Sequence, residues 1–79
     1  MISLLHLEEN EEAIIQYIHH PDEEMRRRLL DLGFYQDTLV KKILTSPKGD
    51  PIAYRIRGTT IALRNNDAKY VEVKKAHGN

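Results

Sequence analysis

The chain has 79 residues, of which 41% are hydrophobic and 30% charged, so it has the size and composition of one soluble globular domain and not of a disordered or membrane-embedded protein. The absence of cysteine excludes disulfides, thiolate metal sites, iron–sulfur clusters and cysteine nucleophiles. The formal net charge is zero, but residues 1–40 hold nine acids and three bases whereas residues 41–79 hold three acids and nine bases, an asymmetry that can mark an interaction surface.

An N-terminal arm, a turn and a first strand are predicted over residues 1–18. The stretch 8–12 is too rich in glutamate to be buried, and Asn10 within it suits a turn because its short polar side chain tolerates a left-handed backbone. The apolar run at 13–18 then predicts the first strand.

A helix is predicted to begin at residues 21–24. Asp22 can cap free backbone N–H groups, and the two glutamates that follow lie where the helix dipole favours negative charge. Met25, Leu29 and Leu32 recur at helical spacing, so we expect them to face the core.

The end of this helix is predicted at Gly33. Glycine can adopt the left-handed conformation that terminates a helix, and Phe34 is placed to pack on Leu29 as in a Schellman motif. One short motif is therefore expected to stop the helix and anchor the exit.

Four further strands are predicted, at residues 38–45, 52–57, 60–64 and 70–74. Two prolines and a glycine in 47–51 predict a hairpin turn, Gly58 is expected to interrupt the ladder, and a single helical turn is expected at 68–69. With about five short strands and one helix inserted between the first and second, the sequence predicts a mainly β domain, a small barrel or sandwich.

The order of these motifs resembles the FeoA family over nearly the whole chain. The resemblance rests on Arg28-Leu29-Leu30-Asp31-Leu32-Gly33-Phe34, Thr38-Leu39-Val40, Gly49-Asp50-Pro51-Ile52, Ile56-Arg57-Gly58, Ile61-Ala62-Leu63-Arg64, Ala68 and Val71-Glu72-Val73. It departs from the family at Asn10, where a glycine is usual, and at Gln36-Asp37, where Pro-Gly is usual.

The resemblance implies a single SH3-like domain over residues 1–79, a closed barrel of about five antiparallel strands with one short α-helix between the first two strands. It also implies a non-enzymatic accessory role in bacterial ferrous iron uptake, in which the chain binds the cytoplasmic part of FeoB, the membrane GTPase transporter, and modulates transport. A related domain at the C-terminus of iron-dependent repressors leaves a metal-responsive regulatory domain as an alternative.

Motifs for catalysis are not found in the sequence. It contains no G-x-x-x-x-G-K-[ST] loop, so nucleotide hydrolysis belongs to the partner. Ser3 and Ser46 lie in an arm and a turn with no motif that suggests a base within reach, and the paired glutamates lie in a polar stretch where water keeps both ionised. We therefore expect no enzymatic activity.

One cluster has the ligand types of a metal site. His19, His20, Asp22 and Glu23 offer imidazole and carboxylate groups that suit Fe²⁺ or another divalent metal. Adjacent histidines in a loop tend to point apart, however, and the segment that follows them is explained as a helix start. Direct metal binding is therefore left open as the weaker interpretation, and no cofactor is assigned.

A basic face is the feature that leaves a nucleic-acid-binding barrel as a third interpretation. Its members are Lys41, Lys42, Arg55, Arg57 and Arg64. Stacking aromatics are missing from it, because Tyr54 falls on the inward face and there is no tryptophan. We therefore expect no nucleic acid partner, and a protein partner is the preferred interpretation.

The helix exit is the preferred contact for a protein partner. Leu30 and Tyr35 lie off the Met25–Leu29–Leu32 stripe, and such side chains are good anchors for docking. The predicted contact comprises Leu30, Leu32, Gly33, Phe34, Tyr35 and Arg57. A weak homo-oligomer is a further possible association.

Membrane insertion is not expected. No apolar run approaches the roughly 20 residues that cross a bilayer. The N-terminus has no lysine or arginine before Arg26, so the basic region of a signal peptide is missing. The expected location is the cytoplasm.

Overall fold

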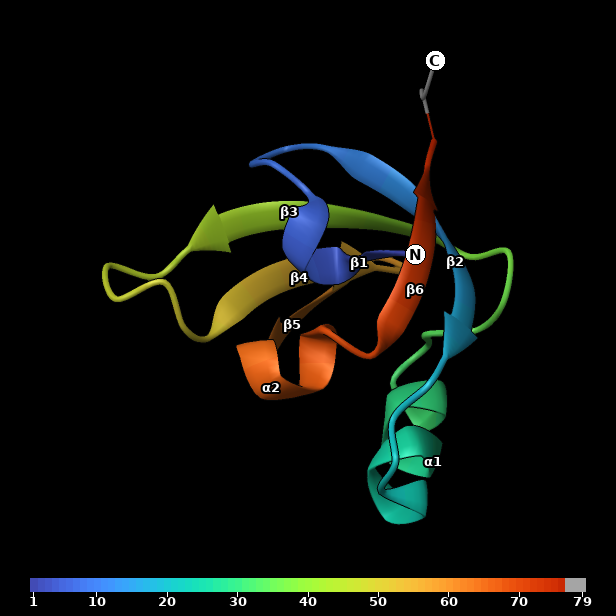
Figure 1. The fold of residues 1–79 in the computed structure, drawn as a ribbon. Helices are drawn as coiled ribbons and strands as arrows, with labels where there is room; N and C mark the ends of the chain where they lie inside the picture. Colours follow the sequence, from blue (N-terminus) through green and yellow to red (C-terminus); the bar gives the residue numbers. More distant parts are fainter. Residues whose placement is uncertain (77–79) are drawn as a thin grey trace.

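One antiparallel sheet makes up most of the structure, a computed structural model in which residues 1–76 are described. Two short α-helices and one 3-10 helix are inserted between its strands (Figure 1). In chain order the elements are β1 (Ile2–Ser3), η1 (Leu4–His6), β2 (Glu12–Ile18), α1 (Glu23–Asp31), β3 (Leu39–Thr45), β4 (Ile52–Ile56), β5 (Thr59–Leu63), α2 (Asn65–Ala68) and β6 (Val71–Lys75).

The strands lie in the order β1-β6-β2-β3-β4-β5, so β6 joins the N-terminal strands to one another. The sheet curls around the core, with α1 projecting from the end of β2 (Figure 1). The predicted mainly β fold with one inserted helix is confirmed. Two details differ from the prediction. The N-terminal arm contributes an additional strand, β1, which was not predicted. Within residues 1–76 the outer strands β1 and β5 do not pair, so the predicted closed barrel is an open sheet.

Strand β1 is short because the chain turns immediately after it, into η1. The Ser3 side chain accepts a hydrogen bond from the Leu5 N–H, and the Ser3 N–H donates to His6 Nδ1, so both bonds of a capping box are formed at the start of η1. Two residues of extended chain are too few to show an alternating pattern. The arm therefore gave no strand signal in the sequence.

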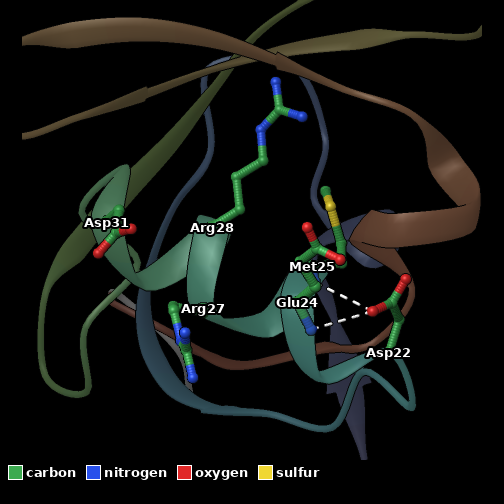
Figure 2. Close-up of a pocket in the computed structure, with 6 residues that line it drawn as sticks. All are labelled: Asp22, Glu24, Met25, Arg27, Arg28 and Asp31. Atoms are coloured by element: carbon green, nitrogen blue, oxygen red, sulfur yellow. Dashed lines mark hydrogen bonds between the residues drawn. The ribbon is translucent and has the colours of Figure 1, made fainter.

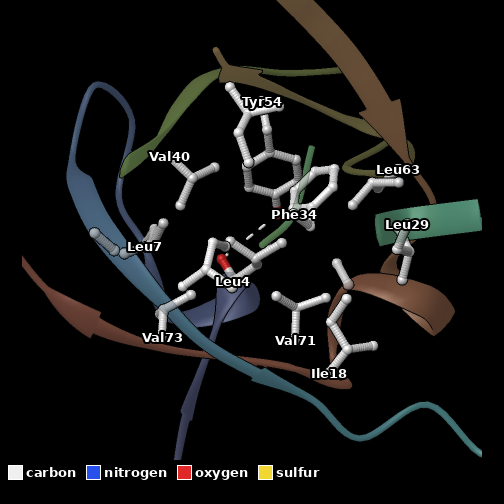
Figure 3. Close-up of a cluster of buried hydrophobic side chains, with 14 of the residues drawn as sticks. Leu4, Leu7, Ile18, Leu29, Phe34, Val40, Tyr54, Leu63, Val71 and Val73 are labelled. Carbon is white, nitrogen blue, oxygen red and sulfur yellow. Dashed lines mark hydrogen bonds between the residues drawn. The ribbon is translucent and has the colours of Figure 1, made fainter. Parts of the chain in front are cut away.

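The core is one cluster of apolar side chains on the concave side of the sheet (Figure 3). Tyr54 lies among them, fully buried, and its hydroxyl donates to the Leu4 carbonyl oxygen at 3.5 Å. Phe34 reaches the same cluster from beyond the end of α1 and is fully buried. The inward orientation predicted for Tyr54 is confirmed.

Both predicted ends of α1 are confirmed. Asp22 Oδ1 accepts the backbone N–H groups of Glu24 and Met25 at 3.0 and 3.3 Å. At the other end Gly33 has φ +111°, its N–H donates to the Leu30 oxygen, and the next N–H, that of Phe34, donates to the Leu29 oxygen. These two bonds define a Schellman motif.

The predicted inward direction of Leu32 is wrong. Its side chain is 38% exposed, whereas Leu29 is fully buried and Met25 is half-buried against the core. Leu32 is the C-cap residue, one position before the chain reverses at Gly33, and the core position beneath the helix end is taken by Phe34. The helical stripe therefore stops one turn earlier than the spacing predicts.

The turns use the residues expected to tolerate a positive φ. Asn10 has φ +68° and Asp37 has φ +70°. Between β4 and β5 the turn is only two residues long, Arg57 at φ +51° and Gly58 at φ +78°, which is the geometry of a tight hairpin. Strand β4 consequently ends at Ile56, one residue before the predicted end.

Within residues 1–76, no helix is both long enough and apolar enough to span a membrane.

Candidate docking surface

Three large apolar side chains are exposed at the exit of α1. Leu30 is 37% exposed, Leu32 is 38% exposed and Tyr35 is 46% exposed. Exposed leucine and tyrosine side chains grouped within six residues form the kind of anchor that protein interfaces use. Leu30 and Tyr35 are placed at the surface as the spacing predicted.

The loop that carries Tyr35 is held to the sheet. The Asp37 N–H donates to the Ile15 oxygen at 2.8 Å, and the Ile15 N–H donates to the Thr38 oxygen at 2.9 Å. The Thr38 N–H in turn donates to the Tyr35 oxygen at 3.1 Å. Because these bonds fix the loop on β2, a partner that binds here pays little for ordering the loop.

Arg57, from the β4–β5 turn, joins the helix exit. Its guanidinium carbon lies 5.9 Å from the centroid of the Tyr35 ring, within the range of a cation–π contact. Its aliphatic part covers Gly33, since a Cβ placed on Gly33 would lie 3.1 Å from Arg57 Cδ. The structure thus brings Arg57 to the residues with which it was grouped in the prediction.

Gly33 and Phe34 support this surface from beneath. Both are buried, and the Phe34 side chain is part of the core. Their contact with a partner stays a prediction, and because both residues are buried we assign them to the support of the exposed residues above them. The exposed members are Leu30, Leu32, Tyr35 and Arg57, and we call these four residues the exit surface.

A hollow of about 410 Å³ extends the exit surface onto the outer face of the sheet. Its lining includes Leu39, which is 46% exposed, the cations Lys41, Arg55 and Arg57, and the acid Glu12. An exposed leucine beside three cations and one acid leaves an excess of positive charge, which suits an acidic protein segment with apolar side chains. The sequence did not predict Leu39 as a surface residue, because apolar and polar residues do not alternate regularly along that strand.

A second hollow, of about 180 Å³, lies where α1 meets β2. Leu30, Tyr17, Phe34 and Ile15 are among the residues that line it. The exit surface therefore has a concave apolar neighbour on its helix side as well as on its sheet side.

A larger hollow, about 470 Å³, runs along α1 itself (Figure 2). Figure 2 shows carboxylates and guanidinium groups along it, with the Asp22 carboxylate occupied as the helix cap. No side chain in its lining is a hydroxyl or thiol nucleophile or a histidine base. We interpret it as a solvated helix flank.

The predicted metal candidates point to different partners. His19 Nε2 lies 2.6 Å from Glu72 Oε1, whereas His20 Nε2 lies 2.8 Å from Asp67 Oδ1. Asp22 caps α1. Across residues 1–76 no three histidine or acidic side chains converge on a point where an ion could be held, so these residues do not fit a shared metal ion.

The basic face is smaller than the sequence predicted. Lys41 and Arg55 are opposite each other on the outer side of the sheet. Lys42 is directed to the other side, where its ammonium group donates to the Leu7 oxygen at 3.0 Å. Alternation along β3 explains the difference, because neighbouring residues of a strand point to opposite faces.

Tyr54 and Glu11 have shifted pKa values, and each group has a structural role. Burial raises the pKa of Tyr54 to about 12. The pKa of Glu11 is lowered, first because its carboxylate accepts the Glu8 N–H and then because Lys75 binds it. Neither group belongs to the exit surface, so neither is a candidate acid or base for chemistry there.

Comparisons with known proteins agree with this architecture. The FeoA domain matches residues 2–75. A Campylobacter jejuni protein named as an Fe(2+) transport protein A is 32% identical over 72 residues, which are 91% of this chain and 96% of that protein. The Fe(2+) transport protein A/Fe(2+) transporter FeoB fusion protein of Porphyromonas gingivalis is 33% identical over 54 residues, which are 68% of this chain but only 6% of the fusion protein.

A solved structure of similar fold comes from Stenotrophomonas maltophilia. It is a FeoA protein in complex with zinc, described as an SH3 domain protein, and it superposes with a TM-score of 0.84 at 28% identity. The match covers 94% of this chain and 91% of that one. The expected SH3-like architecture is thereby confirmed, in the open-sheet form described above.

Proposed function

Because this chain belongs to the FeoA domain family, we propose that it binds the cytoplasmic domains of the ferrous iron transporter FeoB and modulates transport. Family membership makes it a FeoA-type accessory protein of ferrous iron transport and not an enzyme. The choice of partner, the cytoplasmic location and the contact residues are our proposal.

The observation that carries the choice of partner is the fusion protein of Porphyromonas gingivalis. There a segment similar to this chain is joined to FeoB in one polypeptide. Joining two domains raises the concentration of each around the other, which favours even a weak contact between them. A contact between the two domains requires a docking surface on each of them.

The exit surface supplies such a contact. Leu30, Leu32 and Tyr35 offer apolar area, and Arg57 offers a cation that is partly shielded by the tyrosine ring. Tyrosine and arginine are enriched among the residues that dominate binding energies. The bases around the neighbouring hollow add attraction to an acidic surface.

The experiment is a binding measurement against the isolated cytoplasmic domains of FeoB and against full-length FeoB, without nucleotide and with either guanine nucleotide. Leu32→Ser and Tyr35→Ser are expected to weaken binding about tenfold or more. Leu44→Ser is the matched control, because Leu44 is 60% exposed at the far end of β3. No association in any nucleotide state, or equal losses in all three variants, would overturn the proposal.

Direct metal response is a second candidate, because the Stenotrophomonas maltophilia relative was solved with zinc. In this chain His19 and His20 would have to leave Glu72 and Asp67 to share an ion. Calorimetry with Zn²⁺ and with Fe²⁺ under anaerobic conditions decides the matter. Heat that disappears in the His19→Ala/His20→Ala variant supports a site in this loop, whereas heat that is unchanged in the variant excludes it.

A further inference from the structure

Strand β5 is an unprotected edge of the sheet. It is the last strand in the order, and its only ladder within residues 1–76 is the one with β4. Native proteins protect edges with charges, prolines, bulges or very short strands. The opposite edge, β1, is two residues long, but β5 has five residues without a charge or a proline, and its pairing with β4 is regular throughout.

The register of β5 on β4 shows which backbone N–H and C=O groups of β5 point away from β4. A two-residue turn closes the hairpin, so Thr59 is hydrogen-bonded to its opposite residue on β4, and the bonded positions then alternate to Ile61 and Leu63. The N–H and C=O groups of Thr60 and Ala62 therefore point away from β4. Among the described residues they form no hydrogen bond. Both residues are exposed, so an extended segment can reach them.

The outer face beside this edge is basic. Lys41, Arg55 and Thr60 are opposite one another across β3, β4 and β5. Arg64 continues from β5 in an extended conformation, so it follows the same face as Thr60 and Ala62. All three cations are on one side of the edge, and acidic side chains of an added strand would lie on that side within reach of Arg55 and Arg64.

The inner face beside the edge is apolar. Ile61 is half-buried and packs against the core, and Leu63 is buried. Side chains of an added strand alternate between the two faces. Apolar side chains on the inner side of such a strand would therefore lie beside Ile61 and extend the core.

We propose that the edge of β5 binds an extended protein segment in which acidic and apolar residues alternate, by pairing with the backbone of Thr60 and Ala62. The recognition is β-augmentation, with main-chain hydrogen bonds for affinity and the two faces for specificity. This inference is independent of the proposed function, because it names a mode of binding and a chemistry that hold for any protein carrying such a segment.

A second copy of the chain is a poorer occupant. An antiparallel β5–β5 pair centred on Ile61 would bring Arg64 of each copy toward Arg57 at the hairpin turn of the other. Like charges opposite each other destabilise a strand pair. The basic face thus favours an acidic segment over self-association.

The test uses the full chain and an acetylated, amidated heptapeptide of alternating glutamate and valine as the probe. We expect the amide signals of Thr60 and Ala62 to shift on titration and their hydrogen exchange to slow about tenfold, while the amide of Ile61, already bonded to β4, changes little. The same peptide with lysine in place of glutamate is expected to bind about tenfold more weakly.

The control variants separate backbone pairing from other contacts. Ala62→Pro removes an N–H that no strand within residues 1–76 uses, so it is expected to fold and to lose binding, whereas Ala62→Val keeps the N–H and binding. If Ala62→Pro fails to fold, a peptide N-methylated at alternate residues gives the same test, because it cannot pair.

Equal binding of the acidic and basic peptides, unchanged exchange at Thr60 and Ala62, or binding of the N-methylated peptide would each overturn the proposal. Protection of the same two amides without peptide, together with dimers in sedimentation, would also overturn it in favour of a second copy.

Discussion

His20 donates from Nε2 to Asp67 Oδ1 at 2.8 Å, and this bond joins the residues before α1 to the short helix α2, 47 positions away. The other ring nitrogen, Nδ1, accepts the Asp22 N–H at 3.1 Å. Both nitrogens are thus used, which fixes the proton of the neutral ring on Nε2. The His20 side chain is only 10% exposed, so its contact with Asp67 is partly shielded from water, whereas the contact with the Asp22 N–H is exposed.

Removing this ring is expected to destabilise the fold. His20→Ala should lower the free energy of unfolding by about 1–2 kcal/mol, because Asp67 loses its partner in a partly buried position and the Asp22 N–H also loses its acceptor. His19→Ala is the matched control: its ring is 41% exposed, so its bond to Glu72 should contribute no more than about 0.5 kcal/mol. Urea unfolding compares the two, and equal losses would contradict the assigned role of His20.

Gly33 is expected to be the most sensitive of the glycines with a positive φ. Gly33→Ala combines a φ of +111° with a Cβ placed 3.1 Å from Arg57 Cδ, so we expect a loss of about 2–3 kcal/mol. Gly49→Ala has φ +78° and no atom within 4 Å, so only backbone strain applies and the loss should be about 1 kcal/mol. Thermal and urea unfolding measure both, and a larger loss at Gly49 would show that the contact with Arg57 is unimportant.

Stability is expected to fall at alkaline pH because of Tyr54. Its folded pKa of about 12 lies above the ordinary value of 10, so the folded state holds the phenolic proton more tightly than the unfolded chain does. The contribution is fully present below pH 10 and is lost as the pH rises toward 12, by up to about 3 kcal/mol. The comparison is urea unfolding at pH 9 and pH 11.

Tyr54→Phe is the control for this pH effect. The hydroxyl makes only a long bond of 3.5 Å to Leu4, so the variant should fold. Its stability should decline less between pH 9 and pH 11 than that of the parent chain, and the same decline in both would exclude Tyr54 as the cause.

Arg57 can be tested without disturbing its turn. Arg57→Asn removes the guanidinium but keeps a residue that tolerates φ +51°, so stability should change by about 0.5 kcal/mol or less. Binding to the FeoB domains should weaken about tenfold and lose part of its salt dependence. Lys48→Asn, an exposed cation in the β3–β4 turn, should leave binding unchanged. A similar effect of both substitutions would mean that net charge, and not the exit surface, drives association.

Much of the fold could be predicted from short stretches of sequence. The caps of α1, the positive φ values of Asn10 and Gly33 and the inward face of β4 each depend on residues that are close in the chain. Leu32 was misplaced because helical spacing was extended through the C-cap, where the backbone already leaves the helix. Strand β1 was missed because two residues carry no period.

The surfaces were harder to predict because they combine distant segments. Tyr35 was expected at the surface from its own spacing, but its stacking with Arg57 depends on the β4–β5 turn lying against the end of α1. Leu39 is outside, and Lys42 inside, because the β3–β4 register fixes which face each residue takes. His19 and His20 looked like one cluster in the sequence, but their rings bind carboxylates on two different elements.

The sequence by itself determined where helix α1 starts and stops, that the segments of β2 to β6 are strands, and to which family the chain is similar, because capping, turn conformation and alternation act between residues a few positions apart. The tertiary structure alone decided the order of the strands, the open edge at β5 and the contact between Arg57 and Tyr35. Those depend on how the sheet curls to bury its apolar face, a balance over the whole core that no single stretch of sequence encodes.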